Sequence, residues 1–227
     1  MLNQIEQKRA AAVRAAAEVE NDMVVGLGSG TTAAFAIAAL RDRMADGLRI
    51  VGIATSEKTA ALARAYGIPL TDFSDHRTIH ITIDGADAVF RHDLTLIKGL
   101  GGALLREKIV AKASDRMIVV VDESKMADSL GAYATLPVEI LPFGWQVTCD
   151  RLKAMGCRPR LRMAAALPFT TDNGNYIADC SMNQSAAPAA LEAKLAAIPG
   201  VVESGLFVGL ASMVLVGHQT GVEVIER

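Results

Sequence analysis

The sequence is poor in aromatic residues and carries almost no net charge. Aromatic side chains make up 4 % of the 227 residues, so the core must consist of Ala, Val, Leu and Ile. The formal net charge is −2, which does not indicate the basic face that nucleic acids require. DNA and RNA are therefore not expected partners, whereas backbone N–H groups and one or two lysines are enough to bind a small anionic ligand.

Cysteines and long apolar runs are scarce as well. Cys149, Cys157 and Cys180 are odd in number and form no CxxC pair, so we expect buried thiols rather than disulfides or a zinc site. No apolar run approaches the ~18 residues of a membrane-spanning helix, which excludes a membrane partner. The opening segment MLNQIEQKRAAAVRAAAEVE has charges throughout, which predicts a helix, no signal peptide and a cytoplasmic location.

Short β-branched runs alternate with Ala-rich stretches between residues 23 and 122. Strands are predicted at MVVGLGS, RIVGIAT, TIHITID, LTLIKG and RMIVVVD, and helices at 31–44, 57–66 and 104–113. Near-continuous apolar strands separated by helices predict an α/β fold with a Rossmann-like, mostly parallel sheet flanked by helices. Ligands of such sheets bind beyond the carboxyl ends of the strands.

The pattern changes after residue 130. LPVEILPFG, residues 145–155, RPRLRM, YIADC, residues 187–197 and VVESGLFVG follow the order βαββαβ of a ferredoxin-like α+β domain. The TTDNGN segment predicts a turn between the middle strands. SMVLVGHQTG and VEVIER add two closing strands. We therefore expect a Rossmann-like catalytic domain at 1–130 plus 209–227, and a smaller ferredoxin-like domain at 131–208.

The first motif that indicates chemistry is GLGSGTT, residues 26–32, between a strand and a helix. Its glycines allow a tight turn, after which amide groups and the hydroxyls of Ser29, Thr31 and Thr32 gather at the helix N-terminus. Such a turn suits a phosphate or a sugar oxygen, although a plain glycine turn with a threonine N-cap is an alternative. The segment fits neither the GxGxxG nor the Walker pattern.

The second motif is IDGAD, residues 83–87, at the end of a predicted strand. Asp84 and Asp87 are placed to accept hydrogen bonds from sugar hydroxyls, or simply to close the strand with a turn. A metal site is poorly supported, because only His92 and Asp93 follow nearby.

The third motif, LIKGLGGALLREKIV, places Lys98 at a strand end and Glu107 on a helix. The neighbours of Glu107 three and four positions away are all apolar, which is costly for a carboxylate without a task or a partner. Desolvation would raise the pKa of Glu107 toward the range of a general base. Arg106 and Lys108 are interpreted as ordinary solvated charges. An ion-paired Glu107 at the rim of the sheet is the alternative.

A fourth strand end, VVVDESK, places Lys125 at the same predicted sheet edge. The four histidines form no HxH pair, and no GxSxG motif is present.

These motifs occur in the order typical of one enzyme family. GLGSGTTAAF, GIATSEKTAALARAYGIPL, IDGADAV, KGLGGALLREKIV, DESK, TDNGN and IPGVVESGLF resemble the type A ribose-5-phosphate isomerases over nearly the whole chain. The resemblance implies interconversion of D-ribose 5-phosphate and D-ribulose 5-phosphate in the non-oxidative pentose phosphate pathway. It also implies no metal or organic cofactor, and a homodimer or tetramer.

The resemblance further implies a role for each motif residue. Glu107 would be the proton acceptor, Lys98 would stabilise the enediolate, and Asp84 and Asp87 would contact sugar hydroxyls and assist ring opening. Lys8 matches a phosphate-contacting lysine more weakly. Further substrate contacts are implied for Ser29, Gly30, Thr31, Thr32, Gly85, Ala86, Gly99, Leu100, Gly101 and Lys125.

The departures from the family pattern are modest. Ala88 stands where many relatives have Glu, Leu100 interrupts a glycine run, and Ser29 replaces a frequent Thr. Three other functions share parts of the pattern: a sugar-phosphate-sensing regulator domain, an amino-sugar phosphate isomerase–deaminase and a CoA transferase. The sequence lacks the helix pair with which a regulator would bind DNA, and it lacks the histidine beside a motif that a deaminase would need. The LREK context of Glu107 disfavours a CoA transferase.

Overall fold

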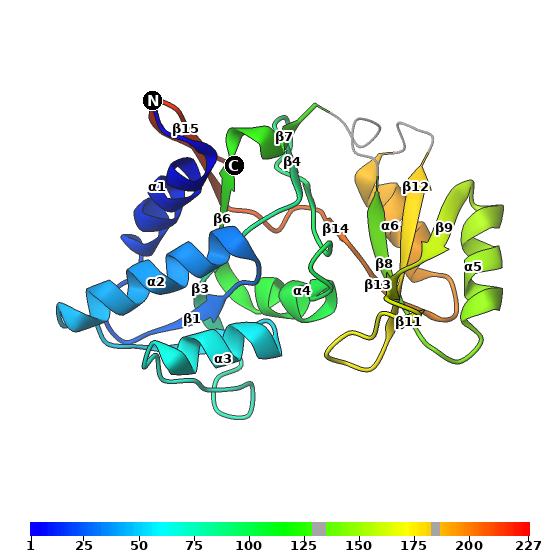
Figure 1. Cartoon of the computed structure of the whole chain (residues 1–227), viewed down its shortest axis with the longest axis horizontal. Helices are drawn as coiled ribbons and strands as arrows, with labels where there is room; N and C mark the ends of the chain where they lie inside the picture. The colour runs from blue at the N-terminus through cyan, green and yellow to red at the C-terminus, as the bar shows by residue number, and fades with distance from the viewer. Residues whose placement is uncertain (129–134, 183–186) are drawn as a thin grey trace. The chain divides into compact units, whose positions relative to one another are not determined.

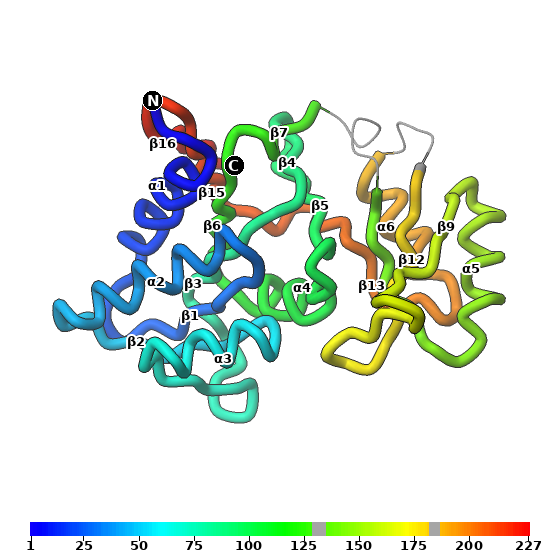
Figure 2. The backbone as a smooth tube through the Cα atoms, in the orientation of Figure 1, coloured from blue at the N-terminus to red at the C-terminus, as the bar shows by residue number. Residues whose placement is uncertain are grey.

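The computed structural model describes residues 1–128, 135–182 and 187–227 (Figure 1). Its chain divides into two compact units. The first unit comprises Met1–Ala86, Arg106–Met126 and Gly209–Arg227, and the second comprises Asp87–Leu105 and Ala127–Val208. Both ends of the chain belong to the first unit, where the Leu2 N–H donates to the Gln219 carbonyl at 3.1 Å (Figure 2).

The larger segment of the second unit begins at Ala127 rather than at the predicted residue 131, and the unit also contains residues 87–105. We expected these residues in the Rossmann-like domain, but most of their contacts lie within the second unit. The reason is strand pairing. The strands at 88–90 and 96–97 pair with each other, and the second of them also pairs with residues 206–207.

The first unit contains a mostly parallel sheet, as predicted. Its strands run in the order β16-β15-β6-β3-β1-β2. All neighbouring pairs are parallel except the β15–β16 hairpin at one edge. The strands are β1 (Met23–Leu27), β2 (Ile50–Ala54), β3 (Ile79–Asp84), β6 (Ser114–Asp122), β15 (Met213–His218) and β16 (Gly221–Glu226).

Helices cover both faces of this sheet. The helices are α1 (Gln4–Ala16), α2 (Thr31–Ala45), α3 (Glu57–Ala65) and α4 (Leu104–Lys112). On one face, side chains such as Val25 and Ile81 pack in one core with residues of α1, α2 and α3. On the other face, Val24 and Ile79 pack with Val110 of α4. Burial on both faces explains why these strands are apolar without alternation.

The segment LTLIKG does not join the parallel sheet, so that prediction is wrong. Only Leu96–Ile97 forms a strand, β5, which pairs antiparallel with β4 (Ala88–Phe90) and β14 (Leu206–Phe207). With β7 (Met126–Ala127), they form a separate sheet in the order β14-β5-β4-β7. A tight turn, in which the Thr95 N–H donates to Asp93, returns the chain from β4 to β5. A short apolar run does not specify the strand with which it pairs. Here the turn between β4 and β5 makes these two strands antiparallel neighbours.

The remainder of the second unit has the predicted βαββαβ order. Its strands run antiparallel in the order β13-β8-β12-β9, and α5 and α6 pack on the sheet. The three cysteines lie in this core, as expected. The elements are β8 (Leu136–Ile140), α5 (Trp145–Ala154), β9 (Cys157–Leu161), β12 (Tyr176–Met182), α6 (Pro188–Ala196) and β13 (Val201–Ser204), with a β10 (Met163–Ala164) and β11 (Leu167–Pro168) hairpin between β9 and β12.

Two details of this unit differ from, or refine, the sequence-based expectation. The single strand expected at VVESGLFVG divides at Gly205 into β13 and β14, which belong to different sheets. The predicted TTDNGN turn is present and surrounds a fully buried carboxylate, since Thr171, Asn173 and Asn175 all donate to Glu139 Oε1. Hydrogen bonds of this kind offset the cost of burying the charge.

No helix in the described part of the chain is long and apolar enough to cross a membrane.

The structure predicts a pH-dependent contribution to stability from His218. Its Nδ1 lies 3.0 Å from Glu123 Oε2 and its Nε2 lies 2.9 Å from Glu223 Oε2. Hydrogen bonds to Glu123 and Glu223 raise the pKa of His218 above its ordinary value. The protonated imidazole therefore stabilises the fold fully below the unfolded pKa of about 6.5, and this contribution is lost as the pH rises through the folded pKa.

Urea unfolding of the wild type and of His218→Gln measures this effect. We expect the wild type to be more stable by at most about 1 kcal/mol at slightly acidic pH, and the difference to shrink in alkaline solution. A difference that stays constant with pH would contradict the assignment.

Candidate active site

Asp84 is the buried centre of the site in the first unit. It ends β3 with a fully buried side chain. Its Oδ1 accepts the N–H of Ser29 at 3.0 Å and the N–H of Gly85 at 2.7 Å. Asp84 therefore ties the GLGSGTT loop to the start of the IDGAD turn, and one of its oxygens has a structural role.

Gly28 makes this close approach possible. A Cβ added at Gly28 would lie 2.2 Å from Asp84 Oδ1 and 2.5 Å from Asp84 Cα. Neither the carboxylate, which two amides hold, nor the backbone of β3 is able to move aside at low cost. The glycine is required for space at this position.

The Ser29 hydroxyl does not face the N-terminus of α2, contrary to expectation. It lies 2.8 Å from Thr55 Oγ1, 2.8 Å from Ser56 Oγ and 3.0 Å from Thr59 Oγ1. This hydroxyl cluster follows β2 and fixes the loop, because Thr55 and Thr59 also donate to the carbonyls of Leu27 and Gly28. Sequence reasoning missed the cluster, although three hydroxyl residues at the carboxyl end of a parallel strand were a usable signal.

The N-terminus of α2 is open to a ligand. Gly30 is its N-cap, with φ of 95°, and no side chain caps the helix, so the alternative of a threonine N-cap is wrong. Gly30 and Thr31 are exposed and Thr32 is partly exposed. Amide groups at the start of a helix bind anions and sugar oxygens well.

Glu107 is buried in the first turn of α4, with 5 % of its surface exposed. Leu104, Val110 and Ala111, at its helical neighbour positions, are also buried. The expectation of a carboxylate on the apolar side of this helix is thus met in the first unit.

The interpretation of Lys108 as a solvated charge is wrong. Lys108 is 1 % exposed and lies with Leu104, Glu107 and Ala111 on one stripe of α4. The buried face of α4 is wider than the apolar residues indicate, so it includes both charged groups. Arg106, in contrast, is partly exposed and pairs with Glu57 at 2.8 Å.

Lys8 and Lys125 lie near the carboxyl end of β6. The Lys8 Nζ is 3.6 Å from Asp122 Oδ2, and Lys125 is partly exposed in the short 3-10 helix η1 (Glu123–Lys125). Burial alone would raise the pKa of Asp122, but hydrogen bonds from Ser124 and Gln4 and the charge of Lys8 lower it below its usual value. Asp122 therefore holds Lys8 as a charged partner.

In the second unit, Asp87 and Lys98 flank the glycine-containing loop 99–102. The Asp87 N–H donates to the Ile97 carbonyl, and Asp87 Oδ2 accepts the N–H of Leu100 at 2.8 Å. Lys98 is 3 % exposed, with its Nζ 5.7 Å from the centre of the Phe207 ring. Ala88 is buried in the core of this unit.

Backbone geometry requires glycine at two positions of this loop. Gly99 and Gly102 have φ of 106° and 84°. Gly101 adopts no such strained conformation, and a Cβ there would meet nothing within 4 Å. The loop therefore exposes backbone to solvent at Gly101.

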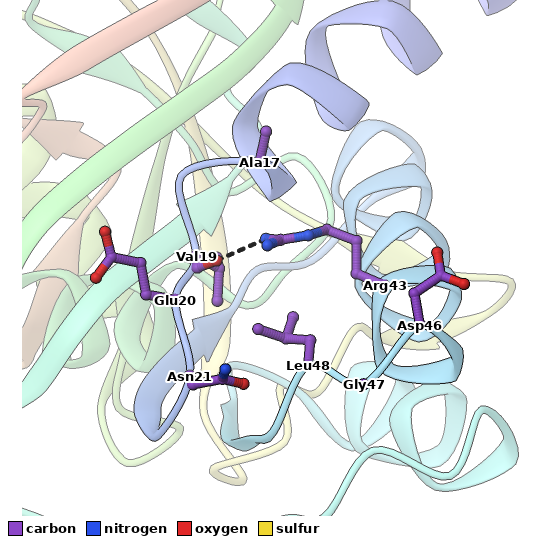
Figure 3. Close-up of a pocket in the computed structure, with 8 residues that line it drawn as sticks. All are labelled: Ala17, Val19, Glu20, Asn21, Arg43, Asp46, Gly47 and Leu48. Carbon is purple, nitrogen blue, oxygen red and sulfur yellow. Dashed lines mark hydrogen bonds between the residues drawn. The ribbon is translucent and has the colours of Figure 1, made fainter.

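A hollow of about 450 Å³ in the first unit lies at the opposite end of the sheet (Figure 3). Its lining residues come before β1 and β2, at the amino ends of these strands. The GLGSGTT and IDGAD motifs lie instead at the carboxyl ends of β1 and β3. Arg43 is engaged there with the Val19 carbonyl at 2.6 Å, and Glu20 and Asp46 are among the lining residues. Two acidic residues and an occupied guanidinium disfavour an anionic ligand.

No group of three or more His, Cys, Asp or Glu side chains is placed to hold a metal ion in the described parts of either unit.

Comparison with known proteins decides the family. The model of the ribose 5-phosphate isomerase A (phosphoriboisomerase A) family matches residues 51–221. The chain belongs to this family. A ribose-5-phosphate isomerase A of Gloeobacter violaceus is 54 % identical over 218 residues, covering 96 % of this chain and 95 % of the relative. The corresponding protein of Gluconobacter oxydans is 53 % identical over 219 residues, covering 95 % and 94 %.

Solved structures agree with this assignment. A D-ribose-5-phosphate isomerase in complex with phospho-erythronic acid superposes with a TM-score of 0.96 at 37 % identity, covering both chains completely. The ribose 5-phosphate isomerase A of Methanocaldococcus jannaschii has a TM-score of 0.93 at 38 % identity, covering 97 % of this chain and 98 % of that one. Membership of the ribose-5-phosphate isomerase A family confirms the predicted fold class and the predicted enzyme class, an isomerase of ribose 5-phosphate.

Gly28→Ala tests the close approach to Asp84. The added Cβ has no room, so we expect a loss of about 1–3 kcal/mol in the free energy of unfolding, measured by urea denaturation. Gly85→Ala is the matched control, because its nearest neighbours would be 3.8 Å away. Equal stability of the two variants would contradict this account.

Proposed function

We propose that this chain interconverts D-ribose 5-phosphate and D-ribulose 5-phosphate, with Glu107 as the base that moves a proton between C2 and C1. The observation that carries the proposal is the burial of Glu107 on α4, in a family whose members are ribose-5-phosphate isomerases. A carboxylate shielded from water is a stronger base than a solvated one, because desolvation disfavours its charged form.

The reaction needs a base and a cation. In the direction from aldose to ketose, Glu107 removes the proton from C2 of the open-chain sugar, and an enediolate forms. The protonated Glu107 then returns the proton to C1, and the hydroxyl proton of the C2 oxygen moves to the C1 oxygen, which gives the ketose. The positive charge of Lys98 stabilises the negative charge that develops on the oxygens, and its burial strengthens that interaction.

Asp84 and Asp87 have a double role in this proposal. Each accepts at least one backbone amide through one oxygen, which orients the carboxylate. We assign to the same two residues the contacts with the sugar hydroxyls and the assistance to ring opening that the family resemblance implies.

The phosphate and the remaining sugar oxygens are assigned to backbone groups and lysines. The open N-terminus of α2 supports amide contacts with the phosphate, and the exposed loop after Lys98 supports amide contacts with the sugar oxygens. Lys125 and, with weaker support, Lys8 would add positive charge. The assigned contacts are Ser29, Gly30, Thr31, Thr32, Gly85, Ala86, Gly99, Leu100 and Gly101.

A ligand recorded for a relative is consistent with this arrangement. Phospho-erythronic acid, present in one solved isomerase, carries a carboxylate and a phosphate. Its carboxylate is planar and anionic, as an enediolate is, so we propose that this chain binds it as well. We also propose a cytoplasmic enzyme of the pentose phosphate pathway that forms a homodimer, with a tetramer as the alternative.

A direct aldose–ketose assay tests the function. Ribose 5-phosphate is compared with the phosphates of allose, arabinose and glucosamine, and we expect the highest kcat/KM with ribose 5-phosphate. Turnover distinguishes the isomerase from a sensor domain, which would bind the sugar phosphate without converting it. Preferred release of ammonia from glucosamine phosphate would instead identify a deaminase.

Glu107→Gln tests the base. The amide is similar in size but cannot accept the C2 proton, so we expect kcat to fall about 10²- to 10⁴-fold with an unchanged circular dichroism spectrum. Glu20→Gln, at an exposed position, serves as the control. A kcat close to that of the wild type would refute the assignment of Glu107.

Lys98→Met tests the cation. Methionine preserves most of the apolar length of lysine and its contact with the Phe207 ring, but it removes the charge. We expect kcat to fall about 10²- to 10³-fold while the melting temperature changes little. A variant that loses stability but retains its kcat would show that Lys98 is structural.

A further inference from the structure

Arg162 makes an unusual set of contacts within the second unit. It lies between β9 and β10, and its Nη1 donates to the carbonyls of Gly99 and Leu100, both at 3.0 Å. These carbonyls belong to the loop that follows Lys98. One side chain from a distant part of the sequence thus binds two consecutive peptide groups of the proposed substrate loop.

Asp179 fixes the position of this guanidinium. Arg162 Nε donates to Asp179 Oδ2 at 3.0 Å, and Arg162 Nη2 donates to Asp179 Oδ1 at 2.5 Å. The two side chains are only 14 % and 15 % exposed, and the guanidinium lies 5.7 Å from the centre of the Phe169 ring. A bidentate pair of this kind is directional, so the remaining N–H groups of Arg162 have a defined direction.

The direction of the carbonyls determines the direction of the amides. A peptide group is planar and trans, so its N–H points away from its C=O. The Gly99 carbonyl binds Arg162, and the N–H of the same peptide, on Leu100, binds Asp87 at 2.8 Å on the opposite side. Because the Leu100 carbonyl also binds Arg162, the Gly101 N–H points to the side on which Asp87 lies.

This arrangement prepares an amide for a ligand. The space beside Gly101 is open, and Asp87 is among the residues that we assign to the sugar. Hydrogen bonds to a carbonyl polarise its peptide group and strengthen the N–H as a donor. The Gly101 amide is therefore directed and polarised before a substrate arrives.

We propose that Arg162, held by Asp179, is a positioning residue that orients the Gly101 amide toward the substrate and keeps the Leu100 amide on Asp87. This inference rests on the proposed isomerase function and adds to it a residue that does not itself touch the sugar. Loss of the contact would leave the loop less well oriented for the enediolate. The competing explanation is that Arg162 only stabilises the packing of the β9–β10 segment against the loop 99–102 and has no effect on catalysis.

Arg162→Lys and Arg162→Met separate these explanations. Lysine retains the charge for Asp179, but a single ammonium group is unable to bind the carboxylate in a bidentate manner and two carbonyls at once. Arg158→Met is the matched control, since Arg158 is exposed on the neighbouring β9 strand. The assay measures kcat and KM for ribose 5-phosphate, and inhibition by phospho-erythronic acid and by inorganic phosphate.

We expect kcat of both Arg162 variants to fall about 10- to 100-fold, because small misplacement of binding groups is costly in a transition state. Inhibition by phospho-erythronic acid should weaken in parallel, while inhibition by inorganic phosphate and the behaviour of Arg158→Met stay close to wild type. A folded Arg162→Lys with kcat within about twofold of wild type would overturn the proposal. So would equal weakening of both inhibitors.

Two further readouts keep the test decisive. If Arg162→Met does not fold, Asp179→Asn takes its place, because asparagine has the same shape and leaves Arg162 less firmly held. Amide hydrogen exchange should show the Leu100 N–H protected in the wild type and exchanging faster in Asp179→Asn; equal exchange would overturn the proposal. An inactive wild type would refute the proposed function, whereas an active wild type with unaffected Arg162 variants would refute only this inference.

Discussion

The first unit depends on one buried carboxylate that accepts backbone amides from two loops. Asp84 Oδ1 binds the N–H groups of Ser29 and Gly85, and a glycine at residue 28 provides the space for it. Without the Asp84 carboxylate, these hydrogen bonds between the loop before α2 and the turn after β3 would be absent. Amide hydrogen bonds to a carboxylate are stronger than those between neutral groups, and burial increases the penalty for breaking them. The open N-terminus of α2 is consequently held in place before any ligand binds.

The second unit applies the same chemistry to a different loop. Asp87 accepts the N–H of Leu100, and on the other side of the same peptide Arg162 donates to the Gly99 carbonyl. In both units an acidic side chain accepts backbone amides, two at Asp84 and one at Asp87, while glycine allows backbone geometry that other residues rarely adopt. Both loops thereby expose amide groups in fixed directions. A chain with a net charge of −2 is able to present an anion site in this way, because the positive potential comes from oriented backbone and a few lysines.

Buried charge is concentrated in and around the motif LIKGLGGALLREKIV. Lys98, Glu107 and Lys108 are each at most 5 % exposed. Desolvating an ionised group is costly, and proteins accept the cost where a shifted pKa or a strong local field is useful. The Glu139 carboxylate shows the structural counterpart, because three hydrogen bonds from the TTDNGN turn engage one of its oxygens. Burial alone therefore does not distinguish a catalytic carboxylate from a structural one.

Sequence patterns alone predict the alternation of strands and helices, the βαββαβ order and the strand ends that carry the motifs. These are local properties, since apolar period, glycine turns and strand length are visible within a few residues. Tertiary structure decided which strands pair, so LTLIKG entered a separate antiparallel sheet and VVESGLFVG was divided between two sheets. It also decided that Lys108 is buried, that the Ser29 hydroxyl faces Thr55 and Ser56, and that Arg162 reaches Gly99. Contacts between residues as distant in sequence as 99 and 162 depend on how the chain packs, and no local pattern encodes them.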